Sequence, residues 1–177
     1  MADFVYPPLD LGENNIRLLQ VKKGGWPNNV SCFLVEASTN EDEAVPYKAL
    51  SYTWGDIEKD SESHPYLPFI FVDDQRFDAT PNLRLALAHI QNSNHDVMLW
   101  TDAICINQTD NRERGHQVKQ MGRIYRNAEE VLIWLGPSDE EIENLFSMIN
   151  LIDQRATKLP VRETWAEHCI RIMTTQN

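Results

Sequence analysis

One stretch of the sequence, residues 97–136, constrains the fold more than any other. It begins with an apolar run over residues 97–106, interrupted only by Thr101 and Asp102, and it ends with a second apolar run over residues 131–135. Both runs are too short to span a membrane, and each has the composition of a buried strand. The polar sequence between them therefore predicts a strand–helix–strand unit.

The middle of this stretch carries the signals of a helix start. Asp110 can accept hydrogen bonds from the first free backbone N–H groups of a helix, and Glu113 stands three residues later, as in a D-x-x-E capping box. The apolar residues that follow recur at three- and four-residue spacing and predict one buried face. They are Val118, Met121, Tyr125 and Ala128. Strand, helix and strand in this order imply a crossover between parallel strands.

Shorter strand-like runs precede this unit. Residues 16–21 and 30–35 flank a turn rich in Gly, Pro and Asn, and this pattern predicts a hairpin. Residues 69–72 and 75–77 predict a second hairpin for the same reason. Between the two hairpins, residues 47–54 predict a further strand, and the polar sequence after it predicts a surface loop over residues 57–68.

Three more helices are expected. Thr80 and Pro81 are placed to cap and open the first of them. Ser138 can cap an acidic second helix over residues 139–152. The third is the weakest prediction and lies within residues 164–177.

The composition excludes several classes of protein. A length of 177 residues suits one domain, and a net charge of −11 argues against a nucleic-acid-binding surface. No apolar run is long enough to cross a membrane, and the start MADFVYPPLD lacks the features of a signal peptide, so we expect a cytoplasmic protein. The three cysteines fit neither a disulfide framework nor a metal site, and the histidines show no metal-binding spacing.

Three segments together resemble a known family. YKALSYTWGD (47–56), TPNLRLALAHI (80–90) and LWTDAICINQTDNRERGHQVKQMGRIYRNAEEVLIWLG (99–136) closely resemble the HET domain of fungal heterokaryon-incompatibility proteins. A motif with this many parts is far more specific than a single glycine signature. The resemblance implies a fungal intracellular protein that acts in non-self recognition ending in programmed cell death, through a protein partner or self-association.

The resemblance also implies a fold and a division of the chain. The expected architecture is an α/β domain similar to the Toll/interleukin-receptor (TIR) fold, with a flavodoxin-like parallel sheet flanked by helices and with added N-terminal β-hairpins. Residues 1–46 then form the lead-in and hairpin, residues 47–152 the HET core, and residues 153–177 a C-terminal helix or incomplete tail. TWAEHCIRIMTTQN stands where the family usually carries a segment resembling R-P-W-F-x-R-x-W-x-x-Q-E, which predicts a short or truncated member.

Candidate site residues gather where the predicted strands end, because parallel α/β sheets bind ligands at the carboxyl ends of their strands. These strand ends carry Ser51, Tyr52, Trp54, Gly55 and Asp56 from one strand, and Asp102, Asn107, Gln108 and Asp110 from another. Of these we expect Asp102 to be catalytic, and Ser51, Trp54, Asp56 and Asn107 to bind a ligand. As an alternative, Asn107 bonds only to its own loop, as asparagine commonly does.

If the TIR resemblance extends to activity, the reaction is cleavage of the nicotinamide–ribose bond of NAD, which is then a substrate and not a required cofactor. Glycosidic cleavage needs a carboxylate beside an oxocarbenium-like centre, and Asp102 and Glu113 are the candidates. Glu113 lies at the margin of the apolar helix face, one turn before Gln117, and can turn toward the strand ends. Trp54 is the candidate surface for stacking a base.

Each of these residues also has a structural explanation. The capping box alone accounts for Glu113. Asp102 can be a buried carboxylate paired with Arg112, Arg114 or a backbone amide, and Trp54 can be a packing residue. Three functions therefore remain open: a signalling domain, an NAD glycohydrolase, and an inactive fragment that interferes with longer relatives. The acidic composition and the incomplete catalytic set favour the signalling domain.

Overall fold

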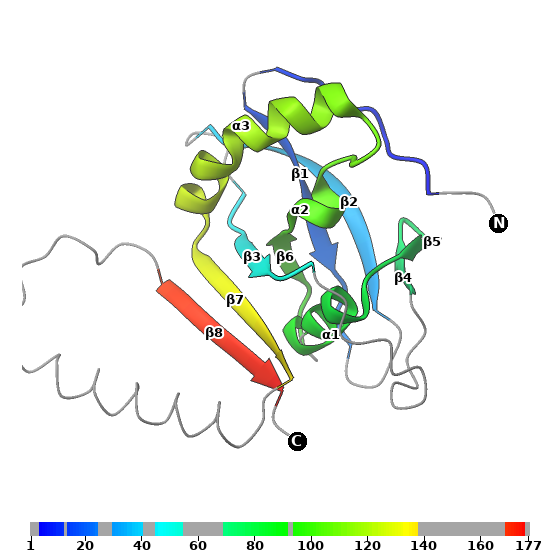
Figure 1. Ribbon diagram of the computed structural model, residues 1–177, viewed down its shortest axis with the longest axis vertical. Helices are drawn as coiled ribbons and strands as arrows, with labels where there is room; N and C mark the ends of the chain where they lie inside the picture. The colour runs from blue at the N-terminus through cyan, green and yellow to red at the C-terminus, as the bar shows by residue number, and fades with distance from the viewer. Residues whose placement is uncertain are drawn as a thin grey trace, which may run out of the picture.

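The computed structural model of the protein describes residues 4–12, 14–24, 30–40, 45–54, 69–91, 94–137 and 169–175, the last of these by backbone alone. The described residues form one eight-stranded sheet with helices packed against it (Figure 1). The elements in chain order are β1 (Asn15–Val21), β2 (Ser31–Ser38), β3 (Lys48–Tyr52), β4 (Phe69–Val72), β5 (Gln75–Asp78), α1 (Pro81–Ile90), β6 (Val97–Trp100), α2 (Asp102–Cys105), α3 (Asn111–Asn127), β7 (Glu130–Pro137) and β8 (Cys169–Thr175).

One half of the sheet is parallel. The order across the sheet is β5-β4-β2-β1-β6-β3-β7-β8. β3 pairs in parallel with β6 on one side and with β7 on the other, and β7 pairs in parallel with β8. Across this half of the sheet the strands follow the order β6, β3, β7, β8. If the four are numbered by their order in the chain, this is the order 2-1-3-4, with which a flavodoxin-like sheet begins. The predicted α/β fold with a parallel sheet is confirmed, whereas the likeness to TIR domains stays a prediction.

The other half of the sheet is built from the two predicted hairpins. β1 and β2 pair antiparallel along their whole length, and β1 also pairs antiparallel with the start of β6. β4 and β5 pair antiparallel around Asp73 and Asp74, whose φ angles of 49° and 59° are those of a tight two-residue hairpin turn. Aspartate tolerates this left-handed conformation better than most residues do, which explains the turn.

Helices cover both faces of the parallel strands. The Tyr47 hydroxyl donates to the Ile124 carbonyl of α3 at 2.6 Å, and the Trp134 indole of β7 donates to Asn82 of α1 at 2.7 Å. Trp134 lies beside Tyr52 of β3, so their side chains are on the same face of the sheet. Tyr47 is five positions before Tyr52, so its side chain is on the other face. Because side chains alternate along a strand, α3 and α1 lie on opposite faces of the sheet.

The start of α1 agrees with its sequence signals. The Thr80 hydroxyl accepts a hydrogen bond from the Leu83 backbone at 3.2 Å, and Pro81 is the first helical residue. Leu83, Leu87 and Ile90 are buried as predicted. The predicted loop over residues 57–68 and the predicted acidic helix over residues 139–152 lie outside the described residues.

The predicted strand over residues 97–106 was wrong in its second half. β6 ends at Trp100, and α2 follows as a single helical turn in which the Thr101 carbonyl accepts a hydrogen bond from the Cys105 backbone at 2.9 Å. Cys105 is fully buried within α2. A short apolar run does not distinguish a buried strand from a buried helical turn, and this is why the sequence misled.

The buried face of α3 also differs from the prediction. Val118 is 51% exposed, although Met121 and Tyr125 are half-buried and Ala128 is buried. The residues that α3 buries most deeply are Glu113, Gln117, Gln120 and Ile124. Two of the polar members, Glu113 and Gln117, contact β1 in the N-terminal part of the chain. The Gln117 amide donates to the Asn15 carbonyl at 2.8 Å.

The helix predicted within residues 164–177 was wrong for residues 169–175. These residues form β8, which pairs in parallel with β7 from Glu130 onward. An uncovered strand edge offers a row of backbone N–H and C=O groups, and β8 satisfies those of β7. Among the described residues, no helix is long and apolar enough to cross a membrane.

Candidate functional site

The carboxyl ends of β3 and β6 bring two predicted site residues into contact. Trp54 follows β3, and Asp102 opens α2 directly after β6. The Trp54 indole N–H donates to both carboxylate oxygens of Asp102, at 3.3 Å to Oδ1 and 3.2 Å to Oδ2. Trp54 is 49% exposed and Asp102 is half-buried, so solvent reaches this contact.

Two tyrosines complete this site. Burial raises the pKa of Tyr52 and of Tyr125, and the nearby Asp102 carboxylate raises both pKa values further, that of Tyr125 to about 12. Both phenols therefore stay protonated beside the carboxylate at neutral pH. We refer to Tyr52, Trp54, Asp102 and Tyr125 as the strand-end cluster.

Asp102 has no cationic partner in the part of the chain that the structure describes. Of the structural partners predicted for Asp102, the two arginines are wrong, because the Arg114 guanidinium donates instead to Gln108 and Asn111 and, among the described residues, no ion pair joins Arg112 to Asp102. The backbone amide is right, because the N–H groups of Asp102 and Ala103 hydrogen-bond to the carboxylate. Burial raises the pKa of Asp102, while the hydrogen bonds from the indole and from these backbone N–H groups lower it. A half-buried carboxylate with a raised pKa, next to aromatic rings, is the kind of group that often marks a functional site.

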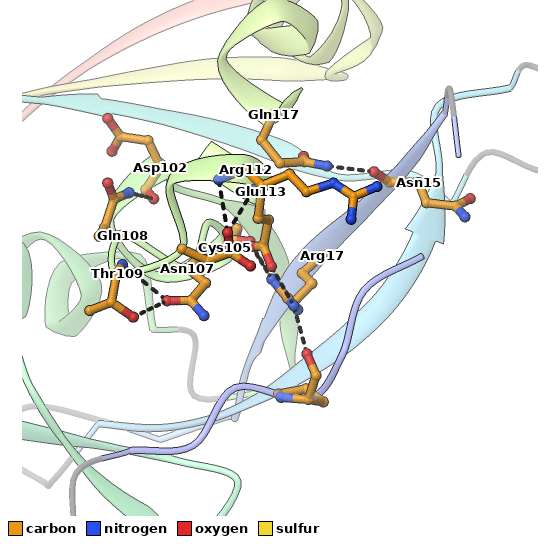
Figure 2. A network of polar contacts seen from close by, with 12 residues as sticks. Asn15, Arg17, Asp102, Cys105, Asn107, Gln108, Thr109, Arg112, Glu113 and Gln117 are labelled. Atoms are coloured by element: carbon orange, nitrogen blue, oxygen red, sulfur yellow. Dashed lines mark hydrogen bonds and ion pairs between the residues drawn. The ribbon is translucent and has the colours of Figure 1, made fainter. Parts of the chain in front are cut away.

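Glu113 lies in a different environment (Figure 2). Its carboxylate forms a two-pronged ion pair with Arg17 of β1, at 2.5 Å to Oε1 and 3.1 Å to Oε2. It also accepts a hydrogen bond from the Asn107 backbone at 2.7 Å. Arg17 is 3% exposed and Glu113 is 4% exposed, so the pair is shielded from solvent.

The capping-box interpretation of Glu113 was therefore only half right. Asp110 caps α3 as predicted, accepting from the Arg112 and Glu113 backbone at 2.8 and 3.1 Å. The Glu113 side chain, however, does not return to the Asp110 backbone N–H, which donates to the Asn107 carbonyl. The charge of Arg17 provides a stronger interaction for a buried carboxylate than a backbone amide does.

The two predicted catalytic carboxylates consequently do not form one site. Figure 2 shows the Asp102 carboxylate pointing away from the Arg17–Glu113 pair. Glu113 has its oxygens occupied by Arg17 and Asn107, whereas Asp102 contacts a half-exposed indole. Of the two carboxylates, only Asp102 is placed at the strand ends where a ligand can reach it.

The loop between α2 and α3 is tied to itself. The Asn107 side chain accepts from the backbone and hydroxyl of Thr109, at 3.1 and 2.7 Å, which is the structural alternative considered for this residue. The Gln108 amide donates to the Asp102 carbonyl at 2.7 Å. Asn107 therefore shapes the loop, and nothing in its contacts directs it toward the strand-end cluster.

The remaining predicted site residues are Ser51 and Asp56. Ser51 is half-buried and is an even number of positions from Tyr47, so it lies on the face of β3 that α3 covers. Asp56 lies outside the described residues.

Sequence reasoning missed Arg17 and Tyr125 as members of the two sites. Arg17 is a charged residue inside a run that otherwise has the composition of a buried strand, and a buried charge requires a partner. That signal was available in the sequence. Tyr52 was expected at the strand end but without a role, and Tyr125 was expected only on the apolar face of its helix.

Other chemistry is not supported by the described residues. Cys32 and Cys105 are buried free thiols, and burial raises the pKa of Cys105 to about 12, which makes a reactive thiolate unfavourable at neutral pH. No group of three or more metal-ligating side chains occurs within the ranges that the structure describes.

Comparison with known proteins identifies the family. The family model described as "Heterokaryon incompatibility protein (HET)" matches residues 47–176, which is most of the chain. The chain is a member of the HET family. The match of this HET domain continues past residue 136, where the resembling motif ended, and it includes β8.

The HET chain is also similar to a curated fungal protein. It is 28% identical over 181 residues to "Heterokaryon incompatibility protein 6, OR allele" of Neurospora crassa. The alignment covers 96% of this chain but 26% of that protein, so the chain spans about a quarter of the relative's length. No solved structure matches the chain.

Proposed function

We propose that this HET domain acts in fungal non-self recognition and that it triggers programmed cell death from the cytoplasm, through contact with a protein partner or with a second copy. The observation that carries the proposal is the family match over residues 47–176, together with the similarity to a heterokaryon-incompatibility protein over nearly the whole chain.

The geometry of the site favours binding to another protein over catalysis. Trp54 presents a half-exposed indole at the strand ends, and exposed tryptophans are frequent anchors of protein interfaces. The pair of catalytic carboxylates that NAD cleavage was expected to use is not assembled, because Glu113 is bound to Arg17. The strand-end cluster is therefore the surface that we assign to recognition.

The test is an incompatibility assay in a fungal strain that expresses the protein. We expect Trp54→Ala and Asp102→Asn to reduce cell death at least tenfold while the proteins remain folded and equally abundant. Val118→Ala is the matched control, because Val118 on α3 is 51% exposed, nearly the same as Trp54. Full activity in both strand-end variants would contradict the role assigned to the cluster.

NAD cleavage is the second candidate function, and one observation favours it. Asp102 is a carboxylate with a raised pKa beside an aromatic ring at the ligand-binding edge of a parallel sheet. On this proposal Asp102 alone would steady the ribosyl centre, and Trp54 would stack on the base. The measurement is NAD consumption by concentrated protein, wild type beside Asp102→Asn. Equal NAD levels with and without the wild-type protein would exclude this candidate.

A further inference from the structure

We propose that Arg17 and Glu113 are positioning residues for the strand-end cluster: they hold α2 and the following loop so that Asp102 lies against the Trp54 indole. This inference rests on the proposed function, because it concerns the site to which recognition is assigned. It adds a second pair of residues, distant from that site, that determines its geometry.

The ion pair fixes the α2 segment at two backbone positions. Arg17 donates to the Cys105 carbonyl at 3.4 Å, and Glu113 accepts from the Asn107 N–H at 2.7 Å. Cys105 is the last residue of α2, and Asn107 opens the loop that leads to α3. One side chain of the pair therefore binds the segment through a carbonyl, and the other binds it through an amide, on either side of Ile106.

The segment that the pair holds is a closed unit. The Gln108 amide donates to the Asp102 carbonyl at 2.7 Å, and the Ile106 backbone donates to the same carbonyl at 3.3 Å. Both ends of residues 102–108 are thus joined to each other. A unit closed in this way moves as one piece, so a displacement at Cys105 or Asn107 is transmitted to Asp102.

The contact that the unit makes with β3 is weak by comparison. Trp54 reaches the Asp102 carboxylate at 3.2–3.3 Å from a half-exposed position, which is long for a hydrogen bond to a charged group. This contact is too weak to hold residues 102–108 in place, so it forms only when other interactions have already positioned them. The bond from the Asn107 N–H to Glu113 is shorter, at 2.7 Å, and the buried ion pair, at 2.5 Å, holds Glu113 in place, so this bond is the stronger constraint on the unit. The contact of Arg17 with the Cys105 carbonyl, at 3.4 Å, adds a weaker one.

Fold stability alone is a poor explanation for a buried ion pair. Replacing both partners by apolar residues of similar size is often neutral or stabilising, because the charges no longer have to be desolvated. Apolar residues cannot, however, bond to the Cys105 carbonyl or the Asn107 amide. The charged pair therefore differs from an apolar pair in making directional hydrogen bonds to the α2 segment.

The N-terminal lead-in supports the same arrangement. The Pro7 carbonyl accepts from Arg17 at 2.6 Å, and the Tyr6 ring lies 5.3 Å from the centre of the guanidinium group. The Nη2 group that donates to Pro7 also donates to Glu113 Oε2, while Nη1 donates to Glu113 Oε1 and the Cys105 carbonyl. The lead-in therefore helps to hold the guanidinium in the orientation in which it binds Glu113 and Cys105.

The experiment compares two double variants in the full chain. Arg17→Met/Glu113→Leu removes the pair, its two backbone hydrogen bonds to the α2 segment and the hydrogen bond to the Pro7 carbonyl. Lys48→Met/Glu130→Leu is the matched control, since it removes an ion pair of equal length, 2.5 Å, at the opposite ends of β3 and β7. The readouts are the indole N–H resonance of Trp54 and the titration of the Asp102 carboxyl, both by NMR.

We expect the first double variant to fold and its Trp54 resonance to move toward the position measured in Asp102→Asn. The pKa of Asp102 should fall toward its ordinary value, because burial is the main cause that raises it. The control should leave both signals unchanged. Unchanged signals in a folded Arg17→Met/Glu113→Leu protein, or equal changes in the control, would overturn the proposal.

A conservative variant covers the case in which the double variant does not fold. Glu113→Gln keeps an oxygen for the Asn107 N–H and for Arg17 but loses the charge. We expect a shift in the same direction and of smaller size, whereas a purely structural pair would leave both resonances in place. The proposed function fails separately: it fails if folded Asp102→Asn keeps full incompatibility activity, whatever the resonances do.

Discussion

Two carboxylates that are eleven positions apart in the chain, Asp102 and Glu113, have opposite environments. Glu113 is 4% exposed and is bound by the Arg17 guanidinium and a backbone amide. Asp102 is half-buried, contacts a neutral indole, and has its pKa raised by burial. The comparison teaches that one carboxylate stabilises the architecture while the other is kept, at some cost in desolvation, where a ligand can meet it.

The largest expected effect is that of removing the buried carboxylate. Glu113→Ala should lower the free energy of unfolding by about 3–5 kcal/mol, because Arg17 remains buried without a counter-charge. Urea denaturation followed by circular dichroism measures this. In the partly exposed pair with Lys48, Glu130→Ala should cost at most about 1 kcal/mol. Equal losses in the two variants would mean that burial does not set the Arg17–Glu113 pair apart from the partly exposed pair.

Loss of the helix cap should have a smaller effect. Asp110→Ala removes the acceptor for the Arg112 and Glu113 backbone N–H groups, and it should lower the free energy of unfolding by about 1 kcal/mol. The same denaturation experiment measures it. A loss as large as that of Glu113→Ala would mean that Glu113 acts mainly through the helix start.

The other carboxylate should behave in the opposite way. Because the folded-state pKa of Asp102 is raised, its contribution to stability is present below the ordinary value of 3.8 and is lost as the pH rises through the folded-state pKa. Asp102→Asn should therefore match the wild type in acid and exceed it at neutral pH, by less than the effect of the helix cap. Denaturation at several pH values tests this. A variant less stable than the wild type at pH 7 would contradict the assignment.

The smallest effect on stability is expected at the exposed indole. Trp54→Phe keeps an aromatic ring but removes the N–H donor, so the free energy of unfolding should change by roughly 0.5 kcal/mol or less. The pKa of Asp102 should rise, because the indole hydrogen bond lowers it. Carboxyl titration by NMR measures this shift, whose direction is opposite to that expected when the Arg17–Glu113 pair is removed. A fall would show that Trp54 mainly desolvates Asp102.

Much of the fold could be predicted from the sequence because its signals are local. Thr80 before Pro81 predicted the start of α1, Asp110 predicted the start of α3, and the Asp73-Asp74 turn predicted the β4–β5 hairpin. In each case the partner groups are at most three residues away. The parallel β6–α3–β7 crossover followed from the lengths of two apolar runs.

The predictions that failed depend on residues far apart in the chain. The strand β8 exists because β7 offers an open edge, and no local signal distinguished it from a helix. Val118 is exposed because the polar residues Glu113 and Gln117 occupy the buried face of α3, where they bind Arg17 and Asn15 of β1. The spacing of apolar residues alone does not predict polar contacts between a helix and a distant part of the chain.

The sequence by itself determined the family and the parallel α/β core, since the multi-part motif and the strand–helix–strand pattern are local signals. The tertiary structure decided that β6 ends at Trp100 and lies beside β3, which brings Trp54 to Asp102. Only the tertiary structure decided the roles of the two carboxylates. Arg17 is 96 positions from Glu113, and Trp54 is 48 positions from Asp102. The groups that surround a carboxylate in space determine its protonation state and its role, and only the fold brings those groups together.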